Sequence, residues 1–195
     1  MASGRLAGWV LRRWGWTIAG EKPAEPRYVL VAAPHSSNWD AVVMLLVARH
    51  FGIRLSWLGK VESFRGPLGP LMRWLGGVQV ERSAAHGRVS ATAQVFRSRD
   101  ALALAIAPDG TRSYREHWRS GFYHIALSAD VPIVLGFLDW GARRTGVGPT
   151  FRLSGDVRAD MERIRSFYGG MLARHPEKTS RVRLLEEDAP RSSSG

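Results

Sequence analysis

A histidine and an aspartate stand five positions apart in the segment 35–40, which reads HSSNWD. The apolar and partly β-branched run 27–33 before it predicts a buried strand, and the apolar stretch 41–50 after it predicts a helix. His35 is therefore expected just past the carboxyl end of a strand, and Asp40 in the first turn of the following helix. This placement makes the pair a candidate site as well as a fold signal.

The spacing limits what the two side chains can do. Within one helix a separation of five residues turns them about 140° apart, because each residue advances about 100°. With His35 on the preceding loop, Asp40 can accept a hydrogen bond from one imidazole nitrogen while the other faces the strand ends. A histidine held in this way can take a proton from a substrate hydroxyl. The alternative is that Asp40 is only the acidic partner of a capping box opened by Ser37 and that His35 is a polar loop residue.

A second strand-to-loop junction follows the apolar run 101–107, where the segment 108–113 reads PDGTRS. A glycine-centred turn after a strand exposes backbone amides, and Arg112 adds a planar, bidentate donor. This loop therefore suits a phosphate group. Its alternative interpretation is an ordinary turn built on Asp109 and Gly110.

These segments resemble the motif blocks of the glycerophospholipid acyltransferases, the lysophosphatidic acid acyltransferase-like family. Residues 35–40 resemble its His-four-residues-Asp signature, and residues 108–113 resemble its third block, usually Pro-Glu-Gly-Thr-Arg-Ser. Residues 60–67 and 76–82 resemble the second block and its approach, and 131–136 resemble the fourth. The blocks keep the family's order and span more than half of the chain. Asp109 departs from the pattern, because it is one methylene shorter than the usual glutamate.

The resemblance implies a transfer reaction. An acyl group would pass from an acyl thioester, on coenzyme A or acyl carrier protein, to a hydroxyl of a lysophospholipid-like acceptor, with no cofactor and no metal. His35 would be the general base and Asp40 would orient it. Direct transfer needs no acyl-enzyme, and a chain without cysteine has no thiol nucleophile. The implied substrate-binding residues are Lys60, Arg82, Asp109, Gly110, Thr111 and Arg112.

For Lys60 and Arg82 the alternative is that they are solvated basic residues after strand ends. For the whole protein two other functions remain open: a thioester or lipid hydrolase, in which His35 activates water, and a non-catalytic protein that binds anionic lipid or nucleic acid. The net charge of +11, from 28 basic and 17 acidic residues, favours an anionic partner. Because the basic residues are scattered and no nucleic-acid motif is present, phospholipid headgroups fit better and no nucleic-acid partner is expected.

The length of 195 residues and the alternation of elements predict an α/β fold: a single domain with a mostly buried mixed sheet covered by helices, acyltransferase-like. Strands are expected near 28–33, 55–59, 77–81, 102–107 and 132–138. Helices are expected at 38–51, 67–75, 86–99, 119–129 and 156–174.

The two ends of the chain differ in composition. Residues 1–24 intersperse tryptophans and leucines with arginines, which predicts an interfacial amphipathic segment; the alternative is a terminal helix that packs its tryptophans on the domain. Residues 25–184 are expected to form the acyltransferase domain, and the polar residues 185–195 a disordered tail. No apolar run reaches the roughly 18 residues of a membrane span, so a peripheral location on the inner, cytoplasmic face of a membrane is expected.

Overall fold

The computed structural model describes residues 2–59, 70, 76–79, 85–109 and 113–188. Its strands are β1 Thr17–Ala19, β2 Arg27–Ala33, β3 Leu55–Gly59, β4 Gly77–Gln79, β5 Leu102–Ile106, β6 Ile133–Asp139 and β7 Arg144–Phe151. Its α-helices are α1 Ala2–Arg13, α2 Asn38–Phe51, α5 Ala85–Arg97, α6 Gly121–Ala129 and α7 Val157–Tyr168, followed by the 3-10 helices η1 Pro176–Lys178 and η2 Leu185–Asp188.

The strands in these residues form one mixed sheet in the order β1-β7-β6-β2-β5-β3-β4. Neighbouring strands are parallel except β6 and β7, which form an antiparallel pair. The central strand β2 lies between β5 and β6, so both of its edges are hydrogen-bonded. The predicted α/β class with a mixed sheet is confirmed.

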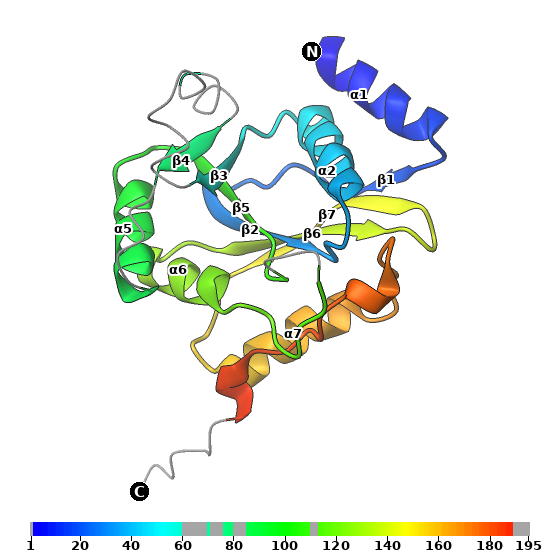
Figure 1. The fold of residues 1–195 in the computed structure, drawn as a ribbon. Coiled ribbons are helices and arrows are strands. Elements are labelled where there is room, and N and C mark those ends of the chain that lie inside the picture. The colour runs from blue at the N-terminus through cyan, green and yellow to red at the C-terminus, as the bar shows by residue number, and fades with distance from the viewer. Residues whose placement is uncertain (1, 60–69, 71–75, 80–84, 110–112, 189–195) are drawn as a thin grey trace, which may run out of the picture.

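Helices cover both faces of the sheet (Figure 1). On one face α2 lies against the sheet with α1 packed on it, and on the other face lie α6 and α7, with α5 beside α6. Alternate residues of β2 serve the two cores: Val29 and Val31 pack with α6 and α7, while Tyr28 and Leu30 pack on the α2 side. Burial on both faces explains why the sequence of β2 is a continuous apolar run rather than an alternating one.

Several predicted boundaries differ from the observed ones. The sequence gives no sign of β1, which has three residues, or of β7, in which Gly146, Gly148 and Pro149 interrupt the apolar pattern. The predicted helix 156–174 ends at Tyr168, because Gly169 and Gly170 follow and Gly170 has a φ of +80°. Of the predicted helix 67–75, only residue 70 lies among the described residues.

The N-terminal segment is continuous with the domain. β1 pairs in parallel with β7, and Leu11 and Trp16 are buried in the cluster between α1, α2 and the sheet. Gly4 allows close packing of the two helices, since a Cβ at this position would lie 3.0 Å from the carbonyl oxygen of Arg49. The predicted boundary at residue 24 therefore does not separate two structural units. Among the described residues, no helix combines the length and the apolar character needed to cross a membrane.

The polar C-terminal segment is anchored further along the chain than predicted. In η2, Glu186 pairs with His124 at 3.1 Å, and Glu187 pairs with Arg165 at 2.6 Å. The predicted disorder from residue 185 is therefore wrong for Leu185–Asp188, because the acidic side chains find basic partners on α6 and α7 that lie far away in sequence.

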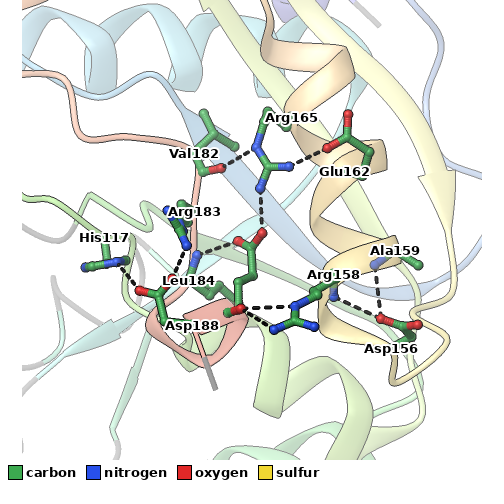
Figure 2. Close-up of polar contacts among 11 residues, drawn as sticks. His117, Asp156, Arg158, Ala159, Glu162, Arg165, Val182, Arg183, Leu184 and Asp188 are labelled. Atoms are coloured by element: carbon green, nitrogen blue, oxygen red, sulfur yellow. Dashed lines mark hydrogen bonds and ion pairs between the residues drawn. The ribbon is translucent and has the colours of Figure 1, made fainter. Parts of the chain in front are cut away.

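The contacts of Glu186 and Glu187 with α6 and α7 form the anchor of η2, and Arg165 lies at its centre (Figure 2). Its guanidinium group donates to the carboxylates of Glu187 and Glu162 and to the carbonyl oxygen of Val182. The other oxygen of the Glu187 carboxylate accepts the backbone N–H of Leu184 at 2.8 Å. Glu187 is 9% exposed, whereas Glu162 is 66% exposed.

We expect Glu187→Ala to lower the free energy of unfolding by about 1–3 kcal/mol, because the half-buried Arg165 guanidinium loses one of its acceptors and the backbone N–H of Leu184 loses its carboxylate acceptor. Glu162→Ala is the matched control, since it removes an exposed carboxylate from the same arginine and should cost less than about 1 kcal/mol. Urea unfolding of the two variants measures both values. Equal losses would show that the anchor is worth no more than a surface ion pair.

The anchor should also weaken in acid. Burial alone raises the pKa of Glu186, but hydrogen bonds from Ser120 and His124 outweigh it and lower the pKa below its ordinary value. A lowered pKa means that the stabilising contribution is present at neutral pH and is lost as the pH falls through the lowered value. In Glu186→Gln, the loss of stability between neutral and acidic pH should be smaller than in wild type.

Candidate active site

The candidate site lies at the carboxyl end of β2, in the middle of the sheet. The chain leaves β2 through a cis Ala33–Pro34 peptide bond and reaches His35 before entering α2. The parallel neighbours β5 and β6 end at the same edge, so the residues that follow them, Asp109 and Trp140, meet the loop after β2. This edge is where open α/β sheets commonly bind ligands.

The carboxylate of Asp40 accepts hydrogen bonds from several groups at this edge. Its Oδ2 atom accepts the backbone N–H groups of Ser36 and Ser37, both at 2.7 Å. Its Oδ1 atom accepts the Ser37 hydroxyl at 3.0 Å and the indole N–H of Trp140 at 2.9 Å. His35 Nδ1 lies 3.5 Å from Oδ2. The carboxylate, 3% exposed, is therefore both a helix-capping group and a neighbour of the imidazole.

The imidazole of His35 lies beside Asp40. Its side chain is 24% exposed, and Nδ1 is the nitrogen that faces Asp40. Nε2 makes no hydrogen bond to a residue in the described part of the chain. The backbone N–H of His35 donates to Asp109 Oδ2 at 3.1 Å, which ties the start of the loop between β2 and α2 to the residues after β5.

Asp109 holds two loops together. Besides the N–H of His35, it accepts the backbone N–H of Ser180 through Oδ1 at 3.2 Å. Burial raises the pKa of this carboxyl group, while the hydrogen bonds from His35 and Ser180 act in the opposite direction. The shorter aspartate reaches the backbone of His35 directly. Asp109 is fully buried, and its carboxylate faces the protein; its predicted contact with substrate stays a prediction.

The remaining predicted site residues, Lys60, Arg82, Gly110, Thr111 and Arg112, lie outside the described residues. The structure therefore brings together three of the predicted residues: His35, Asp40 and Asp109.

Sequence reasoning missed the residues that support the pair from the second half of the chain. Trp140 follows β6 and donates to Asp40, and the Ser36 hydroxyl accepts the backbone N–H of His175 at 3.1 Å. The position of Trp140 just after a predicted strand was its signal, since the ends of parallel strands share one edge. No local pattern marks His175 or Ser180, because each contributes a backbone N–H.

Taken together, the parallel central strands and the histidine–carboxylate pair at their carboxyl edge define an α/β protein with a candidate general base. A family model described as Acyltransferase matches residues 5–134, about two thirds of the chain, and the chain belongs to this family.

The fold is similar to that in the crystal structure of the 1-acyl-sn-glycerophosphate (LPA) acyltransferase, PlsC, from Thermotoga maritima. The TM-score is 0.53 at 14% sequence identity, covering 85% of this chain and 73% of that one. No curated protein sequence matches this chain.

We expect Asp40→Ala to lower the free energy of unfolding by about 3 kcal/mol, because two buried backbone N–H groups and the Trp140 indole lose their acceptor. Asp40→Asn keeps one amide oxygen as an acceptor and should lose less. His35→Ala is the control, since it removes a partly exposed ring and should cost about 1 kcal/mol or less. Urea unfolding tests the order, and an Asp40→Ala variant as stable as His35→Ala would contradict the capping role.

Proposed function

We propose that the protein transfers an acyl group from an acyl thioester to a hydroxyl of a lysophospholipid-like acceptor. The observation that carries the proposal is the geometry of His35 in a chain of the acyltransferase family: Nδ1 faces a buried carboxylate, and Nε2 has no hydrogen-bond partner among the described residues. The acceptor class is supported by the resemblance of four sequence blocks. It is also consistent with the fold shared with a structure titled as an LPA acyltransferase.

In the proposed reaction, His35 Nε2 takes the proton of the acceptor hydroxyl as its oxygen attacks the thioester carbonyl carbon. The tetrahedral intermediate collapses, the carbon–sulfur bond breaks, and the departing thiolate receives the proton from the imidazolium. Asp40 stabilises the transient positive charge and keeps the ring in place. The products are an ester and a free thiol, so coenzyme A and acyl carrier protein are equally suitable carriers.

The predicted ligands of the acceptor keep their roles as part of this proposal. Lys60, Arg82 and Arg112 would bind the phosphate or polar head group, with amides of Gly110 and Thr111 beside them. Asp109, in contrast, would act by holding the backbone of His35, the contact that the structure gives it.

We expect His35→Ala to reduce the release of free thiol from acyl thioester and lysophospholipid by at least about 10²-fold, since the general base is removed. Asp40→Asn should also reduce turnover, because the imidazole loses its anionic neighbour. The comparison needs Asn, because the alanine variant also loses the helix cap. Circular dichroism of both variants checks the fold.

Three outcomes contradict the proposal in different ways. Unchanged turnover in His35→Ala would remove the histidine from the mechanism. Fatty acid released without an acylated acceptor would identify a hydrolase. Lipid binding by a wild-type protein that never turns over thioester would identify a non-catalytic lipid-binding protein.

We further propose that the protein acts as a peripheral protein on the inner, cytoplasmic face of a membrane. The outer surface of α1 exposes Leu6 and Trp9, and that of α2 exposes Trp39, Val42 and Leu45. On α1, the arginines Arg5, Arg12 and Arg13 are exposed as well. Ala7 and Leu11 are buried, so α1 packs one side on the domain and leaves the other side exposed. Exposed tryptophans with flanking arginines suit the headgroup region of anionic lipid.

We expect the double variant Trp9→Ser/Leu6→Ser to bind anionic vesicles several-fold more weakly, because it loses exposed apolar area and no charge. Leu127→Ser/Leu185→Ser is the control, since it removes exposed leucines from α6 and η2. Vesicle co-sedimentation with phosphatidylglycerol measures the difference. Equal binding by both variants would place the interface elsewhere.

A further inference from the structure

Arg174 is an arginine that the sequence blocks do not include. It lies in the segment between α7 and η1, and its side chain is exposed. The guanidinium carbon lies 4.8 Å from the ring centroid of Trp140 and 5.7 Å from that of Trp39. No ion pair joins Arg174 to a carboxylate within the described part of the chain. An arginine that stacks on aromatic rings keeps its N–H groups available for a planar oxyanion.

Arg174 is held in place by neighbours that contact the segment 35–40, which carries His35. One of its two aromatic neighbours, Trp140, donates its indole N–H to Asp40, and the other, Trp39, is the residue before Asp40. The next residue in sequence, His175, donates its backbone N–H to the Ser36 hydroxyl. Arg174 is therefore tied on both sides to the segment that carries His35.

The carboxylates around Arg174 are engaged elsewhere. Asp40 accepts four hydrogen bonds. Asp139 uses Oδ1 to accept the backbone N–H groups of Gly141, Ala142 and Leu172. Glu177 lies 3.6 Å from the His175 ring. The exposed cation therefore has no carboxylate counter-ion among these groups.

We propose that Arg174 binds the phosphate oxyanion of the acceptor lipid beside His35. This inference rests on the proposed function, since it assigns a ligand group to the same site. A phosphate could belong either to the acceptor or to the carrier of the acyl group. The acceptor is favoured, because Trp39 stacks edge-on against exposed Trp14 at 6.2 Å and joins the apolar surface of α1 and α2. At that surface a cation meets lipid headgroups first.

The test is calorimetric binding to the full-length protein without acyl thioester. Three soluble probes are used: hexanoyl lysophosphatidic acid below its critical micelle concentration, monohexanoylglycerol, which lacks the phosphate, and coenzyme A. We expect Arg174→Gln to raise the Kd for the phosphate lipid by about tenfold or more and to leave the other two unchanged. Arg174→Lys should restore part of the affinity, because it returns the charge without the planar stacked group.

Arg163→Gln is the matched control. Arg163 is also exposed and stacks on an aromatic ring, with its guanidinium carbon 4.0 Å from the centroid of Phe151, but it lies on α7 away from His35. The Arg163→Gln variant removes the same charge as Arg174→Gln and should change each Kd less than twofold.

Three results would overturn the proposal. An effect on coenzyme A alone would move the phosphate to the donor. Equal losses in the Arg174 and Arg163 variants would reduce the effect to net charge, and a loss for monohexanoylglycerol would reduce it to local structure. Because no acyl transfer is measured, an Arg174-dependent phosphate site in a protein without thioester turnover would refute the proposed function and leave this inference standing.

Discussion

The buried carboxylate of Asp40 is the interaction on which the site depends. It collects hydrogen bonds from the loop before α2, from the helix N-terminus and from an indole one hundred residues later, and it lies beside the imidazole. A charge buried this deeply is tolerated because its oxygens are satisfied by donors. The same bonds turn the chain from strand to helix, so one side chain both caps the helix and lies beside the His35 ring. The two initial interpretations of Asp40, cap and partner of the histidine, are therefore compatible.

The order of the strands determines which other groups lie near Asp40 and His35. Because β2 is flanked by β5 and β6 running parallel to it, the loops after all three strands arrive at one edge. Asp109 from the β5 side fixes the backbone of His35, and Trp140 from the β6 side fixes Asp40. The segment after α7 then crosses the same edge, where Ser180 and His175 bond to Asp109 and Ser36. The imidazole is thus supported by strand ends and by a crossing segment.

The sequence predicted the buried strands and the pair His35 and Asp40 because both leave local signals: continuous apolar runs, a helix start and a fixed spacing. It failed for β7, whose glycines and proline interrupt the apolar pattern, and for η2, whose glutamates pair with arginine and histidine side chains far away in sequence. It also missed the role of Trp140, because the position just after a predicted strand places this residue at the edge but does not name its partner one hundred positions away. Backbone N–H donors such as those of His175 and Ser180 carry no residue preference at all, so only coordinates reveal them.

The crossing segment after α7 has a consequence for how this enzyme scaffold can vary. The family match ends at residue 134, yet Trp140, His175 and Ser180 all contact the loop or the carboxylates of the motif. Part of the site's surroundings therefore lies outside the residues that the family model matches. An engineer seeking a new acceptor preference could exchange the segment between α7 and η2 as a cassette. The backbone hydrogen bonds from His175 to Ser36 and from Ser180 to Asp109 would need to be kept. His35 and Asp40 would stay unchanged.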